Sequence, residues 1–79
     1  KLKYLMIETR SINDALYGEG EKVGEHEFIT SHYRRFIDPE IIKKTISVNF
    51  KILSFEENTG FSKTQNDDPC LIRIIAIKK

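Results

Sequence analysis

The fold is decided by the run Cys70-Leu71-Ile72-Arg73-Ile74-Ile75-Ala76-Ile77. This is the most apolar stretch of the chain, and only Arg73 interrupts it. A strand that is apolar on both faces belongs in the middle of a sheet, because its neighbours and a covering layer then remove both faces from water. We therefore predict that residues 70–77 form a central strand with one partner strand on each side.

Two other stretches have the composition of strands and are the expected partners. Residues 2–8 are mainly apolar on both faces over a strand-like length, and residues 50–57 are apolar at four positions. Because residues 70–77 are the most apolar, we predict the sheet order first, third, second strand. The last strand is then antiparallel to both neighbours, and a right-handed crossover through a helix joins the outer pair.

The crossover helix is predicted over residues 39–48. Asp38-Pro39-Glu40 provides an acceptor side chain at the cap, a proline at the first helical position and an acid in the first turn. Asn49 is expected to end the helix in a left-handed conformation. Its apolar stripe is predicted to consist of Ile41, Ile42, Thr45, Ile46 and Val48.

Residues 8–31 and 58–69 are polar and contain the glycines, so we predict long loops there. Within the first loop, a short helical turn is expected over residues 12–17, with Ser11 or Asn13 as its cap. The predicted elements follow the order strand, loop, helix, strand, loop and strand. We therefore predict an α/β fold in a single segment, residues 1–79.

Charge and cysteine content restrict the partners and the compartment. Thirteen basic and twelve acidic residues leave a net charge of +1, so no strong field attracts nucleic acid or an anionic membrane. An RNA-binding sheet face ranks last, because Tyr4, Phe50 and Phe55 lie among aliphatic residues. No apolar run approaches the roughly 20 residues of a membrane helix. Cys70 is the only cysteine, which favours a reducing compartment, and we expect the cytoplasm.

A single helix shields only one face of a three-stranded sheet. We therefore expect an open sheet face and an unpaired edge at residues 2–8, through which the chain self-associates or docks onto a partner. The chain opens on Lys1 and enters an apolar run at once, with no methionine or turn before it. On this basis we expect it to be the C-terminal portion of a larger domain.

Two patterns that suggest ligand sites are weak. Gly18-Glu19-Gly20 and Gly24 do not directly follow a strand, and acidic neighbours would repel a phosphate. We read them as loop glycines. His26, His32 and Cys70 lack the spacing of a metal site, so we assign no metal ligand.

Four runs of residues carry a resemblance to a known family. They are Ile7-Glu8-Thr9-Arg10-Ser11-Ile12-Asn13-Asp14-Ala15-Leu16-Tyr17-Gly18-Glu19-Gly20-Glu21, His32-Tyr33-Arg34-Arg35-Phe36, Asn49-Phe50-Lys51-Ile52 and Asp68-Pro69-Cys70-Leu71-Ile72-Arg73. Together they resemble the C-terminal part of class I S-adenosylmethionine-dependent methyltransferases, in a bacterial branch that acts on small substrates. The runs at 14–18 and 32–36 are the most distinctive.

The resemblance implies a partial Rossmann-like methyltransferase sheet, with residues 2–8, 50–57 and 70–77 as its fifth, sixth and inserted seventh strands. It also implies the acceptor-side segment of a methyltransferase that acts on a small or polar substrate and is inactive alone. The glycine-rich cofactor loop and the acid that holds the cofactor ribose are missing here. S-adenosylmethionine would therefore bind only in the complete protein, together with a small-molecule acceptor.

The resemblance also implies roles for individual residues. Candidates for a general base are Glu8, Asp14 and His32. The expected substrate-binding residues are Arg10, Ser11, Tyr17, Tyr33, Arg34 and Arg35. Structural roles are open as alternatives: Arg10 pairs with Glu8, Ser11 and Asp14 cap a turn, and the arginines of the 32–36 run are solvated. The alternative function is a stand-alone small α/β protein-interaction module.

Overall fold

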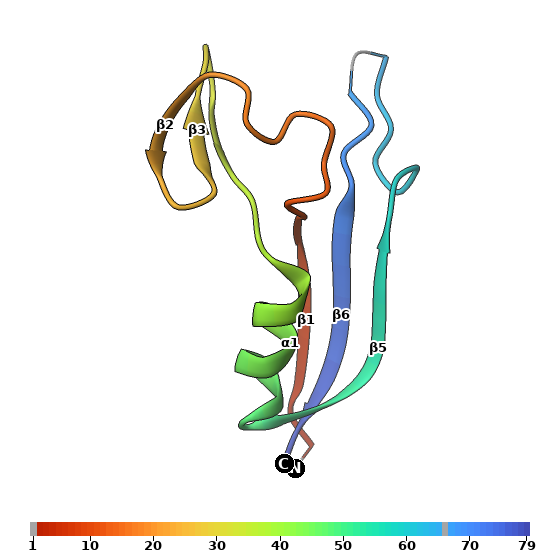
Figure 1. Ribbon diagram of the computed structural model, residues 1–79. Helices are drawn as coiled ribbons and strands as arrows, with labels where there is room; N and C mark the ends of the chain where they lie inside the picture. Colours follow the sequence, from red (N-terminus) through yellow and green to blue (C-terminus); the bar gives the residue numbers. More distant parts are fainter. Residues whose placement is uncertain (1, 66) are drawn as a thin grey trace.

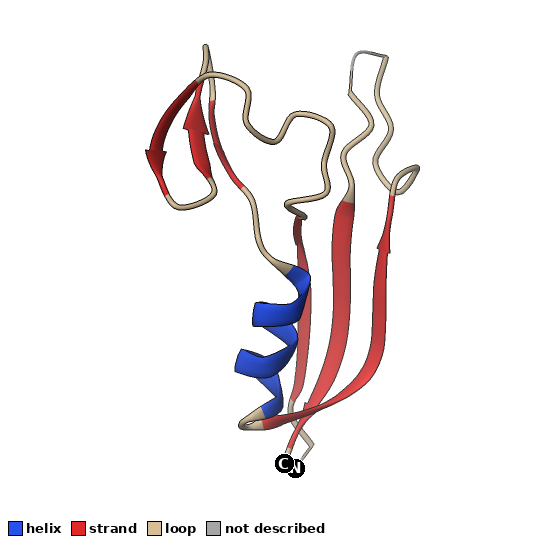
Figure 2. Ribbon diagram, viewed as in Figure 1, coloured by secondary structure: helices blue, strands red, loops and turns tan. Residues whose placement is uncertain are grey.

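The computed structural model describes residues 2–65 and 67–79, so Lys1 and position 66 of the predicted 58–69 loop lie outside the described residues. Six strands and one helix are found in these ranges (Figures 1 and 2). In chain order they are β1 (Tyr4–Arg10), β2 (Glu21–Gly24), β3 (Glu27–Ile29), β4 (Tyr33–Arg35), α1 (Pro39–Ser47), β5 (Phe50–Asn58) and β6 (Leu71–Lys78).

The three long strands form one sheet in the order β1-β6-β5. β6 is antiparallel to both neighbours, with Ile74 opposite Ile7 on β1 and Phe55 on β5. The predicted pairing order of these strands is therefore confirmed, and each strand lies within two residues of its predicted bounds. Burial explains why β6 is the central strand: its side chains Ile72, Ile74 and Ala76 form the core of the sheet and are 1% exposed or less.

Helix α1 lies against one face of this sheet, where Ile46 packs on the β6 core residues (Figure 1). Asp38 accepts a hydrogen bond from the Glu40 backbone N–H at 2.9 Å, so the predicted helix start is confirmed. The helix ends within one residue of its predicted end, but the predicted left-handed termination at Asn49 is wrong: Val48 caps the helix in a right-handed conformation, and Asn49 has no positive φ. The predicted stripe is also too wide, since Ile41 is 56% exposed and Val48 is 71% exposed.

A second small sheet, in the order β2-β3-β4, occupies a region predicted to be loop. The predicted α/β fold class with a partial Rossmann-like sheet is therefore wrong. The chain is mostly β: two antiparallel sheets and one nine-residue helix account for its described elements. The prediction failed because these strands are three or four residues long and largely polar, which leaves too little alternation to mark them.

The first loop differs from its prediction in a second respect. Residues 12–17 form consecutive turns rather than a helical segment, with hydrogen bonds from Asp14 N–H to Ser11 C=O and from Tyr17 N–H to Asp14 C=O. Both bonds measure 3.0 Å. These turns carry the chain from β1 across to the small sheet.

The face of the main sheet opposite α1 is open, as expected from a single covering helix. Its side chains include Tyr4, Met6 and Ile75, which are 59%, 77% and 40% exposed. No helix within the described ranges has both the length and the apolar character needed to cross a membrane.

Candidate functional site

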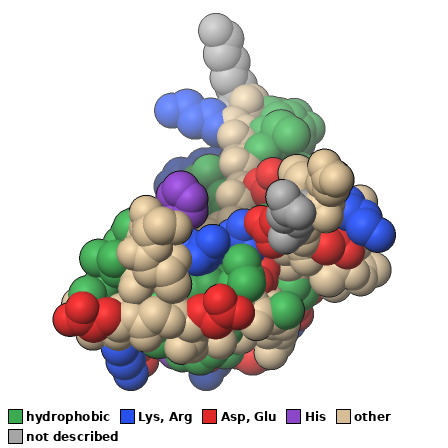
Figure 3. All heavy atoms as spheres, turned by 90° about the horizontal axis from the view of Figure 1, so that it is seen from above, with side chains coloured by type: hydrophobic (Ala, Val, Ile, Leu, Met, Phe, Trp, Pro, Cys, Tyr) green, Lys and Arg blue, Asp and Glu red, His purple; other side chains and the backbone are tan. Residues whose placement is uncertain are grey.

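The polar end of the main sheet is where β1 and β5 finish and β6 begins. We define the β1-end network as the hydrogen-bonded residues Arg10, Ser11, Asn13, Asp14, Glu57, Asp67 and Cys70. Seen from this end, basic and acidic side chains lie next to each other in the middle of the surface (Figure 3).

Asp14 is the centre of this network. Its side chain is 1% exposed and accepts hydrogen bonds from Arg10 at 2.9 Å, from the Leu16 backbone N–H at 2.8 Å and from the Cys70 backbone N–H at 2.9 Å. Arg10 also donates to Asp67 at 2.5 Å. The carboxylate of Asp14 is thus fully occupied in joining the end of β1 to the start of β6.

Ser11 and Asn13 both donate to one carboxylate oxygen of Glu57 at the end of β5. Ser11 is completely buried, and its hydroxyl also accepts from the Asn13 backbone N–H at 3.0 Å. The backbone of Ser11 forms a parallel bridge with Ile37, just before α1. These contacts connect the end of β1 to the end of β5 and to the segment that precedes α1.

The thiol of Cys70 lies beside the same carboxylates. Burial raises its pKa, and the negative charges of Glu57 and Asp14 raise it further, while a hydrogen bond with Ser11 lowers it in part. A thiol with a raised pKa is protonated at neutral pH and is a poor nucleophile. Through its backbone N–H, which donates to Asp14, Cys70 joins the start of β6 to the network.

A cleft of about 320 Å³ lies beside the small sheet. We call it the hairpin cleft. Its lining residues are Glu25, His26, Glu27, Arg35, Phe36, Ile37, Asp38 and Ile41. Glu27 and Arg35 face each other across β3 and β4. Asp38 is engaged at the cap of α1.

Tyr33 extends the polar side of the small sheet. Its hydroxyl donates to Glu27 at 2.7 Å, and this hydrogen bond raises the pKa of Tyr33. The Tyr33 phenol is therefore neutral at ordinary pH. It holds the Glu27 carboxylate in place beside Arg35.

His26 is a residue that sequence reasoning set aside. It lies at the turn between β2 and β3 with φ of 61°, and its carbonyl accepts from the Phe36 N–H at 2.9 Å. Its Nδ1 is 2.7 Å from the Tyr17 hydroxyl, and its Nε2 is 3.7 Å from a Glu25 carboxylate oxygen. The hydrogen bond with Tyr17 therefore fixes the orientation of the imidazole, while Glu25 at 3.7 Å is near Nε2 without a hydrogen bond.

Tyr17 fixes this histidine to an aromatic cluster. Its ring packs edge-on against Phe28 and Phe36, with centroid distances of 5.1 and 5.4 Å. Phe36 is 1% exposed. These contacts fix the position of Phe36, the one ring of this cluster that also lines the hairpin cleft.

The remaining predicted site residues are not brought together. Arg34 shares a face with Phe28 and donates to Thr30 at 3.3 Å, whereas Arg35 lines the hairpin cleft on the other face of β4.

His32 lies at the turn between β3 and β4, where its backbone N–H reaches the Thr30 hydroxyl at 3.5 Å. Glu8 pairs with Arg73 at 2.6 Å on the open sheet face, away from both the network and the cleft.

Several network and cleft residues carried no usable signal in the sequence. Glu57 and Asp67 join the network through contacts with residues 46 and 57 positions away, so no local pattern marks them. His26 was detectable only as a polar residue at a hairpin turn that was itself not predicted. Among the described residues, no group of three His, Cys, Asp or Glu side chains is arranged to hold a metal ion.

Comparison with protein-family models and with curated proteins gave no match to this chain.

Proposed function

We propose that this chain is the acceptor-side segment of an S-adenosylmethionine-dependent methyltransferase, which acts on a small polar substrate in the cytoplasm and is inactive without the part that binds the cofactor. One observation carries the proposal: two of the runs that resemble the family, residues 7–21 and 68–73, meet at one end of the sheet although they are far apart in the sequence. Asp14 of the first run accepts a hydrogen bond from the Cys70 backbone N–H of the second, 56 positions away.

The described residues do not fit S-adenosylmethionine itself. Gly20 has a φ of 93°, but a Cβ there would collide with the backbone oxygen of Ile29, so this glycine allows two protein segments to approach each other. Gly18 faces open space but precedes no helix whose N-terminus points toward a ligand. We therefore assign no step of methyl transfer to a cofactor site on this chain.

The hairpin cleft is the part of the chain suited to an acceptor. Methyl transfer depends on positioning, because the acceptor lone pair must be aligned with the methyl group. The guanidinium of Arg35 pairs with a carboxylate or phosphate, and Glu25 accepts from an acceptor N–H or O–H. Phe36, Ile37 and Ile41 supply an apolar wall. Because Glu25, Glu27 and Asp38 outnumber Arg35 in the lining, the cleft favours a small zwitterion whose anionic group pairs with Arg35 and whose cationic donor group faces the carboxylates.

His26 is placed to take the acceptor proton. In the tautomer whose Nδ1–H donates to Tyr17, its Nε2 carries the free lone pair on the side of Glu25 and the cleft. The proton released as the acceptor forms its bond to the methyl group would pass to Nε2, and Glu25 would stabilise the resulting imidazolium.

Two measurements test the proposal. Calorimetric titration of the 79-residue chain with S-adenosylmethionine is expected to give no saturable heat, and saturable binding at micromolar concentration would overturn it. In the complete enzyme, Arg35→Gln is expected to raise the KM for the acceptor about tenfold or more, since a charge-assisted contact is lost. The Kd for S-adenosylmethionine should be unchanged, and a loss of cofactor binding alone would contradict the assignment.

A further inference from the structure

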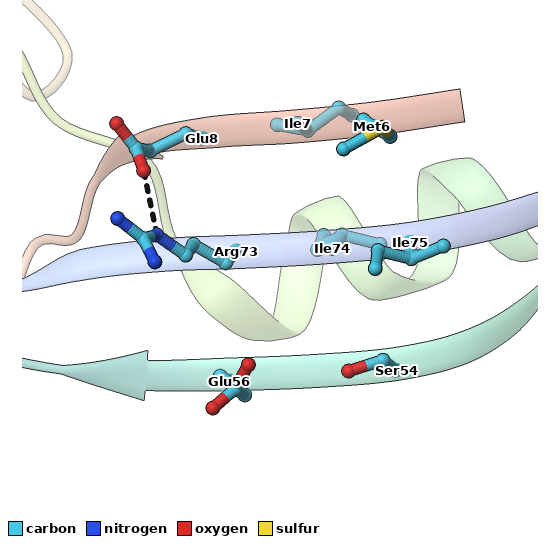
Figure 4. Close-up of a pocket in the computed structure, with 8 residues that line it drawn as sticks. All are labelled: Met6, Ile7, Glu8, Ser54, Glu56, Arg73, Ile74 and Ile75. Carbon is cyan, nitrogen blue, oxygen red and sulfur yellow. Dashed lines mark hydrogen bonds and ion pairs between the residues drawn. The ribbon is translucent and has the colours of Figure 1, made fainter. Parts of the chain in front are cut away.

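The open face of the main sheet carries three cross-strand rows of side chains. The first row is Glu8, Arg73 and Glu56; the second is Met6, Ile75 and Ser54; the third is Tyr4, Ile77 and Lys51. A hollow of about 370 Å³ lies over the first two rows (Figure 4). The view shows α1 behind the sheet, so this hollow is on the uncovered side.

Two of the three residues of the middle row, Met6 and Ile75, are apolar and exposed. Met6 is 77% exposed and Ile75 is 40% exposed, and the neighbouring Leu53, at the β5 bulge, is 51% exposed. None of the three packs against the core cluster under α1. Contiguous exposed apolar side chains of this kind mark an interaction surface.

The rows on either side carry opposite charge. In the first row Glu8 is paired with Arg73 at 2.6 Å, which leaves the negative charge of Glu56. Arg73 is further occupied by the ring of Phe61, 4.2 Å away. In the third row Lys51 supplies the only charge. The face is therefore negative at one end, apolar in the middle and positive at the other end.

This distribution is complementary to itself. A twofold axis that runs across the strands through the middle row places each strand over its own copy in the opposite direction. Glu56 of one chain then lies over Lys51 of the other, because both residues are on β5, and the pair occurs twice. Aligned packing of two sheets with apolar inner faces is a common architecture.

We infer that the open face binds a second copy of this chain, as a face-to-face dimer closed by two Glu56–Lys51 ion pairs. The dimer does not depend on the acceptor site, since the hairpin cleft lies in another part of the chain and shares no residue with this face.

Sedimentation velocity over a range from low to high micromolar concentration tests this inference. Wild type is expected to be a dimer that dissociates on dilution. Lys51→Glu and Glu56→Lys, each tested alone, bring like charges together twice and should raise the dimer dissociation constant about tenfold or more. A matched control is Lys44→Glu, an exposed change of the same charge on α1, which should leave the constant unchanged.

Mixing the two single variants gives the most specific readout. In a heterodimer of Lys51→Glu with Glu56→Lys, both cross-chain contacts join opposite charges, so dimerisation should return to within about threefold of wild type. Restored association also demonstrates that both variants are folded. A monomeric wild type, a mixture that stays monomeric, or an equal loss in Lys44→Glu would each overturn the inference.

Discussion

At the scale of single residues, Asp14 has the largest structural role at the end of β1. Its buried carboxylate accepts from Arg10 and from two backbone N–H groups. Asp14→Asn removes the charge and turns an amide N–H toward one of these donors. We expect the free energy of unfolding to fall by about 3 kcal/mol, which urea denaturation measures.

Asp67→Asn is the matched control for this change. Asp67 binds the same guanidinium but its side chain is 32% exposed, so solvent screens the pair. Its loss should lower the free energy of unfolding by less than about 1 kcal/mol. Equal effects of the two substitutions would mean that Asp14 is not the centre of the network.

Cys70 gives a pH-dependent prediction. Burial, with Glu57 and Asp14 adding to it, raises the pKa of its thiol in the folded state above the ordinary value of 9.0. The folded chain then holds the proton more tightly than the unfolded chain, so this stabilisation is present below pH 9.0 and is lost as pH rises through the folded-state pKa. Iodoacetamide at pH 8 should modify Cys70 more slowly in the folded chain than in urea. Equal rates would contradict the raised pKa.

The sequence identified part of this site. Arg10, Ser11 and Asp14 were expected in the site from the family resemblance, and they lie together at the end of β1. Glu57 and Asp67 were not selected, since only long-range pairing brings them there. Arg34 and Arg35 were grouped as neighbours, whereas consecutive residues of a strand face opposite sides, and only Arg35 enters the cleft.

At the scale of elements, two glycines allow a direct comparison. Both Gly18 and Gly20 have positive φ, but Gly18 faces open space while Gly20 approaches the backbone of Ile29. Gly18→Ala should therefore lower the free energy of unfolding by about 1 kcal/mol, the cost of a left-handed residue. Gly20→Ala adds a backbone collision and should cost about 3 kcal/mol.

Urea denaturation of the two variants separates these contributions. Gly20→Ala should also increase hydrogen exchange at the backbone amides of β2 and β3, because the collision pushes the entry of β2 away from the end of β3. Equal stability of the two alanine variants would contradict the close approach at Gly20.

The elements differ in how far the sequence determined them. Helix α1 was predicted from Asp38-Pro39-Glu40, because a cap is a local signal. Strands β1, β5 and β6 are long enough for their apolar content to identify them. The small sheet was missed for two reasons. Its turn at Glu25 and His26 lacks the usual asparagine–glycine pair, and Phe28 is the one buried side chain of its three strands, so no apolar pattern marks them.

At the scale of the whole molecule, the predicted order of the long strands followed from one argument, the apolar content of β6 on both faces. The order is correct, but only the face under α1 is buried, since Ile75 on the other face is 40% exposed. The predicted fold class was wrong. An α/β fold requires several helices, whereas the structure has one helix among its described elements and residues 8–31 contain strands β2 and β3. The opposite charges at the two ends of the open face depend on the cross-strand register, and the bulge in β5 shifts that register.

The central claim is that the hairpin cleft holds a small acceptor through Arg35. It is tested most directly by titrating the ¹⁵N-labelled chain with β-alanine, which carries both an anionic and a hydrogen-bond-donating group, beside propionate and propylamine as single-charge controls. We expect β-alanine to shift the amide signals of His26, Arg35 and Phe36 at millimolar concentration, and each control to shift them less. The effect should disappear in Arg35→Gln and persist in Arg34→Gln. Shifts that persist in Arg35→Gln, or that disappear equally in Arg34→Gln, would contradict the claim.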